Sequence, residues 1–226
     1  VQYVPVEISL DDQKVRQVHL AQCYSMAITE AGDLYAWGVN DSGIIGKGTP
    51  SDTAKFFDKP QKITELKHVK AIDSETLRGF CNAALQEDGS LYLWGDNRCE
   101  RIGKHGEFGY SVSPPVMVLD KVKQVSLGGC YSDTHGGNNN LNVGGGFCVA
   151  VKEDGSLWTW GCNSAGQLGR GKYITDRGIG MVTIPEDKDS RAYEAEAYTA
   201  DDSPQITPDP ANPVKQTAGF TGLTLN

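Results

Sequence analysis

The chain has 226 residues, of which 38% are hydrophobic and 22% charged, and it carries a formal net charge of −8 at pH 7. This length allows one or two domains. Nucleic-acid binding requires a concentrated basic face, so the acidic balance and scattered Lys and Arg residues argue against it. No apolar run reaches the roughly 18 residues of a membrane-spanning helix. No targeting segment is recognisable, which leaves both a cytoplasmic and a secreted location open.

The first part of the chain reads as short strands separated by turns. A Pro-led strand is predicted at residues 5–10, a second strand at residues 15–18 and a third at residues 27–28. The Glu-Ala-Gly sequence that ends at Gly32 predicts a tight turn, because glycine adopts positive φ without steric cost. A further strand follows at residues 34–37.

This order of elements occurs three times. Residues 32–46 read GDLYAWGVNDSGIIG, residues 89–103 read GSLYLWGDNRCERIG, and residues 155–169 read GSLWTWGCNSAGQLG. Six of the fifteen positions are identical in all three segments without a gap. Such self-similarity indicates a repeat architecture. The positions expected to be structural are Gly32, Trp37, Gly38, Gly89, Trp94, Gly95, Gly155, Trp160 and Gly161.

The strand that follows each turn alternates with large residues on both faces. In the first copy, Leu34 and Ala36 lie on one face, and Tyr35 and Trp37 lie on the other. Both faces are therefore expected to be covered. The recurring tryptophan is expected to pack rather than to bind a ligand. Further strands are predicted at residues 60–66, 69–72, 83–85, 115–119, 122–125, 149–151 and 181–184.

The Asp-Gly turn, the aromatic-x-Trp-Gly-x-Asn motif and the later glycine resemble the regulator of chromosome condensation repeat. The resemblance covers roughly residues 1–184 and implies β-propeller blades of four antiparallel strands, usually about seven in the family. It does not fix an activity. Members include an exchange factor for a small GTPase, regulators of ubiquitin ligases, kinases or channels, and a secreted inhibitor of β-lactamase.

The resemblance therefore predicts an all-β fold with about three recognisable blades, at residues 11–66, 67–120 and 121–184. Some positions depart from the family. Glu100 stands where the other repeats have Gly43 and Gly166. The family often has Gly-x-x-His-Ser before the hairpin. Here the His place holds Tyr24, Cys81 and Phe147, and the Ser place holds Ser25, Asn82 and Cys148.

Three repeats are fewer than the four to eight blades of a closed propeller, and open sheet edges favour aggregation. A fragment of a longer parent chain, or a subunit completed by further copies or another chain, is the favoured interpretation. The alternative is that residues 1–10 and the tail supply extra strands. Residues 185–226 read as an acidic Pro-rich linker or tail, in which the alternating pattern at 219–225 predicts a possible terminal strand.

The chain contains six cysteines and no Cys-x-x-Cys pair. Cys23, Cys81 and Cys148 lie near the start of the first hairpin strand of each repeat and are expected to be buried thiols. Disulfides are the alternative. Cys99 and Cys162 form one possible pair, because each follows Trp-Gly in a neighbouring repeat.

An insertion at residues 130–146 interrupts the third repeat. It is rich in Gly and Asn and cannot form a core, so we expect a loop, and loops on rigid scaffolds often carry function. Cys130 and Cys148 flank the insertion and are a possible disulfide at its base. A metal site at its start matches no known ligand spacing, and no metal or cofactor is expected. The candidate partner-binding residues are Tyr131, Asp133, His135, Asn138, Asn139 and Asn140.

No catalytic constellation is present in the sequence, so no enzyme activity is expected. The four histidines share no ligand spacing, and the motifs of serine hydrolases, zinc proteases and phosphate-binding loops are absent. The Gly-rich stretches at residues 43–48 and 166–171 recur after Trp-Gly-x-Asn, which identifies them as blade turns.

The sequence thus predicts a non-enzymatic scaffold that binds a protein partner through rim loops, chiefly the insertion. Three alternatives remain open. They are a structural or assembly component of a bacterial or phage surface particle, in which copies complete each other, a guanine nucleotide exchange factor for a small GTPase, and a secreted enzyme inhibitor. The residues contain no exchange motif that would favour the second.

Overall fold

The computed structural model describes most of the first 183 residues. The described ranges are 4–21, 23–48, 56–74, 81–97, 100–103, 110–130, 145–163, 166–171 and 178–183. All of them lie in the first of two compact units, Val1–Thr183, and the second unit is Ile184–Asn226. None of the helical residues in these ranges forms a segment long and apolar enough to cross a bilayer.

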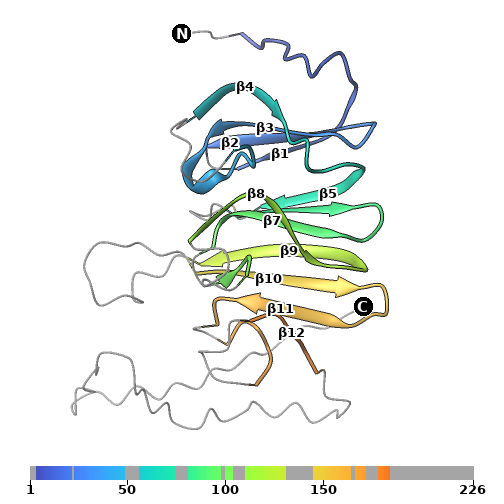
Figure 1. The fold of residues 1–226 in the computed structure, drawn as a ribbon, viewed down its shortest axis with the longest axis vertical. Coiled ribbons are helices and arrows are strands. Elements are labelled where there is room, and N and C mark those ends of the chain that lie inside the picture. The colour runs from blue at the N-terminus through green and yellow to red at the C-terminus, as the bar shows by residue number, and fades with distance from the viewer. Residues whose placement is uncertain are drawn as a thin grey trace, which may run out of the picture. The chain divides into compact units, whose positions relative to one another are not determined.

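The described residues form three antiparallel sheets of four strands each, which confirms the predicted all-β fold (Figure 1). The first sheet contains β1 (Val15–Leu20), β2 (Tyr24–Thr29), β3 (Leu34–Val39) and β4 (Phe56–Lys62), with the short 3₁₀ helix η1 (Asp41–Gly43) after β3. The second contains β5 (Val69–Ser74), β6 (Cys81–Gln86), β7 (Leu91–Asp96) and β8 (Ser111–Leu119). The third contains β9 (Val122–Cys130), β10 (Gly145–Lys152), β11 (Leu157–Gly161) and β12 (Gly180–Met181).

The predicted tight turns join the second and third strands of every sheet. In the first sheet, the Gly32 amide donates to the Thr29 carbonyl at 2.9 Å and the Thr29 amide donates to the Asp33 carbonyl at 3.0 Å. Gly32, Gly89 and Gly155 have φ angles of 80°, 84° and 83°. A residue with a side chain is disfavoured at such angles, which explains why this glycine occurs in every repeat.

Two hydrophobic cores lie between neighbouring sheets, so the two-faced alternation of the strands is also confirmed. Leu34 and Ala36 of the first sheet share a core with Trp94 of the second, and Leu91 of the second shares one with Trp160 of the third. Trp94 and Trp160 are both 0% exposed. The packing role predicted for the tryptophans is therefore confirmed at these two positions.

Each buried tryptophan also makes a polar contact with the preceding sheet. The indole Nε1 of Trp94 donates to the Ile44 carbonyl at 2.7 Å, and that of Trp160 donates to the Arg101 carbonyl at 2.6 Å. The residue at the family's Ser place reaches the same carbonyl. Asn82 Nδ2 donates to Ile44 at 2.8 Å, and the Cys148 thiol donates to Arg101 at 3.7 Å.

The asparagine of Trp-Gly-x-Asn shapes the loop that presents this carbonyl. Asn40 Oδ1 accepts a hydrogen bond from the Ile45 amide at 3.1 Å, one residue beyond the Ile44 carbonyl. The corresponding bonds run from the Ile102 amide to Asn97 at 2.9 Å and from the Leu168 amide to Asn163 at 3.1 Å.

A second backbone contact joins the sheets at the hairpin turns. The Val69 amide donates to the Gly32 carbonyl at 2.9 Å, and the Val122 amide donates to the Gly89 carbonyl at 2.9 Å. A Cβ added at Gly32 would lie 2.7 Å from the His68 Cα, so the next sheet leaves no room for a side chain there.

Two predicted features differ from the structure. Residues 5–9 form no strand, although the corresponding Pro60 lies in β4. The Pro-led strand β4 pairs with β3 and so completes the first sheet. Residues 5–9 would need a similar strand that comes before them in the chain, and no sheet precedes β1 among the described residues. Glu100 takes φ 55° in place of the glycine of the other repeats. Its position is therefore strained for a residue with a side chain.

Replacing Trp94 with Phe removes one buried hydrogen bond and part of a buried ring. We expect the free energy of unfolding to fall by about 1–3 kcal/mol. The control is Trp158→Phe, because Trp158 is half-buried and its indole donates within its own turn to Ser156 Oγ at 2.9 Å. The control should lose less than about 1 kcal/mol. Urea unfolding followed by circular dichroism measures both, and equal losses would contradict the inter-sheet role.

Candidate protein-interaction surface

Among the described residues, the strands of the third sheet extend further than those of the other two at the rim where the insertion begins. β9 has 9 residues and β10 has 8, whereas β1, β2, β5 and β6 have 6 each. The last described strand pairs at this rim are Leu20 with Ser25 in the first sheet and Ser74 with Asn82 in the second. The third sheet pairs Leu127 with Cys148 at this level and continues through Gly128 with Phe147, Gly129 with Gly146 and Cys130 with Gly145.

This three-pair extension, the β9–β10 ribbon, is fastened to its surroundings. The Leu127 amide donates to Asp73 Oδ2 at 2.8 Å, which ties β9 to β5 of the second sheet. The Phe147 ring lies against Gly128, since a Cβ there would come within 2.5 Å of the ring. The Cys162 amide donates to the Gly146 carbonyl at 2.8 Å, so the residue after β11 also holds the ribbon.

The predicted partner-binding residues lie outside the described part of the chain. The described ribbon ends at Cys130 and resumes at Gly145, and Tyr131, Asp133, His135, Asn138, Asn139 and Asn140 all fall between these ends. The structure therefore describes the base from which the insertion starts.

The cysteines follow the prediction in part. Cys81 and Cys148 are buried thiols, as expected, but Cys23 is exposed. The structure does not support the possible disulfide between Cys130 and Cys148. The Cys148 thiol donates to the Arg101 carbonyl, and the register of the ribbon places Leu127, not Cys130, opposite it.

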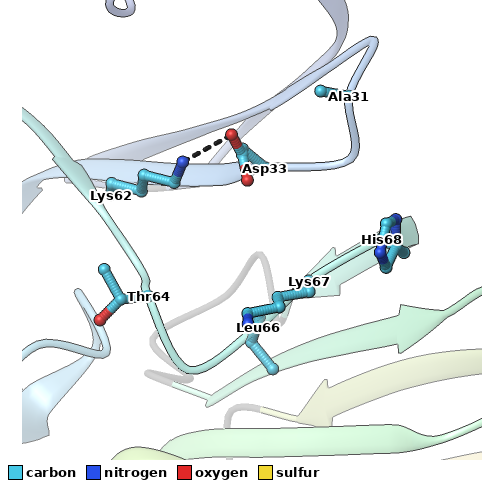
Figure 2. A pocket seen from close by; sticks show the side chains of 7 residues that line it. All are labelled: Ala31, Asp33, Lys62, Thr64, Leu66, Lys67 and His68. Atoms are coloured by element: carbon cyan, nitrogen blue, oxygen red, sulfur yellow. Dashed lines mark hydrogen bonds and ion pairs between the residues drawn. The ribbon is translucent and has the colours of Figure 1, made fainter.

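The opposite rim carries a pocket that sequence reasoning did not predict. Figure 2 shows it between the β2–β3 turn and the β4–β5 connection. Lys62 Nζ lies 2.6 Å from Asp33 Oδ2, and Gln13 Nε2 donates to the same oxygen at 3.0 Å. The pocket is about 350 Å³ and is lined by Ala31, Asp33, Lys62, Thr64, Leu66, Lys67 and His68.

The electrostatics of this pocket centre on Asp33. The hydrogen bond from Lys62 holds the pKa of Asp33 below its ordinary value of 3.8. Desolvation by burial acts against this effect, and the weaker contribution of the Gln13 bond acts with it. Asp33 is therefore ionised at neutral pH and already paired with a cation.

The structure and the sequence both match a known repeat. Residues 31–75 and 154–185 match the family model described as "Regulator of chromosome condensation (RCC1) repeat", and residues 140–167 match a second model of the same description. The chain is 30% identical to mouse "Regulator of chromosome condensation" over 179 residues, which is 76% of this chain and 38% of the relative.

Two further proteins match over a similar share of this chain. The mitochondrial RCC1 domain-containing protein RUG3 of Arabidopsis thaliana is 28% identical over 165 residues, which is 71% of this chain and 33% of that protein. The crystal structure of Prp20p from Saccharomyces cerevisiae, a protein described with its binding to Gsp1p and histones, has a TM-score of 0.56 and 18% identity. The similarity covers 75% of this chain and 38% of Prp20p. The chain thus spans 33% to 38% of the length of these proteins.

Replacing Asp33 with Asn should destabilise the protein in a pH-dependent way. The folded pKa of Asp33 lies below the unfolded one, so the stabilisation is complete above the unfolded value and is lost as the pH falls through the folded value. At pH 7 we expect a loss of about 0.5–1 kcal/mol, which is small because Lys62 is 38% exposed and solvent screens the pair. At a pH below the folded pKa of Asp33, the variant and the wild type should unfold alike.

Urea unfolding at neutral and acidic pH tests this prediction. The matched control is Asp120→Asn, since Asp120 pairs with Lys152 at 2.8 Å but is 60% exposed. The control should show no resolvable change at either pH. A loss for Asp33→Asn that persists unchanged at acidic pH would contradict the assignment to the ionised carboxylate.

Proposed function

Because the chain carries repeats of the regulator of chromosome condensation family, we propose that it is a non-enzymatic scaffold that binds a protein partner through its rim. Repeats of this family commonly mediate protein interactions or nucleotide exchange. The binding element that we propose is the insertion at residues 131–144.

The observation that supports this proposal is the β9–β10 ribbon. It adds three paired positions beyond the level of the last described strand pairs of the first two sheets. Hydrogen bonds from Leu127 to Asp73 and from Cys162 to Gly146 hold it. A fixed base lowers the conformational entropy that the insertion loses on binding, because its two ends are already held at the spacing of a strand pair.

The composition of the insertion indicates the kind of partner. It contains one tyrosine, several asparagines and many glycines, with Asp133 and His135 as its only titratable side chains apart from Tyr131. Tyrosine supplies a large contact area at low entropic cost, and asparagine supplies hydrogen bonds that adapt to the partner. A folded protein with a polar surface and a pocket for one aromatic ring therefore fits better than an apolar peptide or a nucleic acid.

Replacing residues 131–144 with a Gly-Ser segment of equal length tests the proposal. We expect the fold to be retained, because the described pairing ends at Cys130 and Gly145. A photo-reactive residue at Asn139 should cross-link to a partner in an extract of the source organism. A photo-reactive residue at Asp88, an exposed position in a turn at the opposite rim, should not.

The decisive measurement uses the partner identified by cross-linking. Calorimetry with that purified protein should give at least a tenfold weaker affinity for the Gly-Ser chain, or about 1.4 kcal/mol. Matching thermal unfolding of the two chains shows that the scaffold is intact. An affinity that the replacement leaves unchanged would contradict binding through the insertion.

A further inference from the structure

A basic residue occupies the same position in the first strand of every repeat. The first strands β1, β5 and β9 are each an edge strand of their sheet, and each begins with a valine that is followed by Lys or Arg. Lys and Arg make up only 21 of the 226 residues, so composition alone does not account for a cation at this position in all three copies. These three residues, the basic row, are Arg16, Lys70 and Lys123.

A β-bulge positions each residue of the basic row. The strand register passes over Arg16, Lys70 and Lys123, whereas the residues on either side of each one pair with the neighbouring strand. A bulge re-aims a side chain, and bulges are over-represented beside functional sites. Because the bulge and its cation recur together in all three sheets, they are a repeated feature and not an irregularity of one strand.

The basic row is exposed to solvent in all three sheets. Lys70 lies on the second sheet, which packs against the first sheet on one side and the third on the other. It is exposed there, although the preceding residue Val69 is 0% exposed. The exposure therefore belongs to the bulged position and does not depend on a sheet that lacks a neighbour.

Hydrogen bonds between the edge strands hold the basic row together. Arg16 Nη2 donates to the Val69 carbonyl at 2.7 Å and to the Lys70 carbonyl at 3.3 Å, so the guanidinium lies against the backbone of the next cation in the row. The bond from the Leu127 amide to Asp73 joins β9 to β5 in turn. The fold thus gathers on three neighbouring strands cations that are scattered in the sequence.

No residue of the basic row makes an ion pair within the part of the chain that the structure describes. Two lysines elsewhere do, since Lys62 pairs with Asp33 and Lys152 with Asp120. Like charges on neighbouring strands repel one another when no opposite charge lies between them. The row therefore has an electrostatic cost that a bound anion would remove.

The acidic residues near the basic row are engaged elsewhere. Asp73 is the one acidic residue within β1, β5 and β9, and its carboxylate accepts hydrogen bonds from the Ser74 and Leu127 amides. A glutamate in each hairpin turn donates its amide to the carbonyl of a basic residue two positions before the row. These contacts join Glu30 to Lys14, Glu87 to His68 and Glu153 to Lys121.

We propose that the basic row binds an acidic segment of a partner protein, whose Asp or Glu side chains supply the missing counter-charges. Carboxylates form charge-assisted hydrogen bonds with both Lys and Arg. Arg16 uses a single nitrogen for its two carbonyl contacts, so the other N–H groups of its guanidinium remain for a carboxylate. The two lysines follow on the next two strands, where a short segment that crosses the strands reaches them.

A protein segment fits the basic row better than a nucleic acid does. Nucleic-acid binding draws its affinity from many neutralised phosphates and therefore needs a broad basic face. The row has three cations, glutamates lie in the adjoining turns, and the chain has a net charge of −8. A short acidic segment needs only as many cations as it has carboxylates to place.

The basic row and the insertion are separate sites. Lys123 lies near the start of β9, whereas the insertion begins after Cys130 at the other end of that strand. Binding of an acidic segment to the row is thus a second activity that does not rest on the insertion.

Fluorescence anisotropy of the full chain with a labelled peptide of eight glutamates tests the proposal. The peptide should bind at low ionic strength, and its affinity should fall as salt screens the exposed charges. The variant combines Lys70→Gln with Lys123→Gln, because neither side chain makes a hydrogen bond or ion pair within the described ranges. We expect its affinity to be at least about fivefold weaker than that of the wild type.

The matched control combines Lys47→Gln with Lys59→Gln. Both lysines are exposed, one in the loop after η1 and the other on β4 at the opposite edge of the first sheet. The control changes the net charge by the same amount, and its affinity should stay within about twofold of the wild type. Unchanged circular dichroism and thermal midpoints show that both variants retain their fold.

Three outcomes would overturn the proposal. The first is a wild-type chain that does not bind the glutamate peptide at low ionic strength. The second is an equal loss of affinity in the two double variants, which would assign binding to net charge and not to the row. The third is tighter binding of an eight-residue thymidine oligonucleotide than of the peptide, which would favour a nucleic acid as the ligand.

The chain with the Gly-Ser replacement at residues 131–144 separates this inference from the proposed function. It retains the basic row and should bind the glutamate peptide with the affinity of the wild type. Loss of binding to the cross-linked partner without loss of peptide binding would support both proposals. Equal loss of peptide binding in this chain would assign the peptide to the insertion and overturn the role of the row.

Discussion

The structure depends on one buried carbonyl group in each contact between sheets. The loop after Trp-Gly-x-Asn turns the carbonyl of Ile44 or Arg101 into the next sheet, where water cannot reach it. A buried acceptor without a partner costs about 1–3 kcal/mol. The indole of the following repeat removes this cost together with the side chain of Asn82 or Cys148, and its ring fills the same space with apolar surface. Tryptophan is the natural choice because it combines a large ring with a single donor.

This contact explains why the repeat tolerates no gap within its fifteen residues. The middle copy donates its tryptophan to the repeat before it and offers its loop carbonyl to the repeat after it. The asparagine fixes the loop, as in the bond from Ile45 to Asn40, and the closing glycine leaves room for the indole. A change of spacing in the middle copy would displace both halves and disturb two interfaces.

Much of the contact between sheets could be predicted from the sequence, because the residues that form it recur in every repeat. The turn glycines, the two-faced strands and the packing of Trp94 and Trp160 were predicted in this way, since residues that recur at one position share a structural role. The acceptor carbonyl could not be predicted, since it belongs to the backbone of residues as different as Ile44 and Arg101. The strand predicted at residues 5–10 failed for a related reason. A strand needs a neighbour to pair with, and composition alone does not supply one.

The loop predicted at residues 130–146 was wrong at its two ends, because Cys130, Gly145 and Gly146 pair within the β9–β10 ribbon. Gly128 fits in the ribbon because the Phe147 ring lies where a side chain would be.

The Asp33–Lys62 ion pair was also not predicted from the sequence. Asp33 reads as a turn residue, and its partner is 29 positions away on an outer strand.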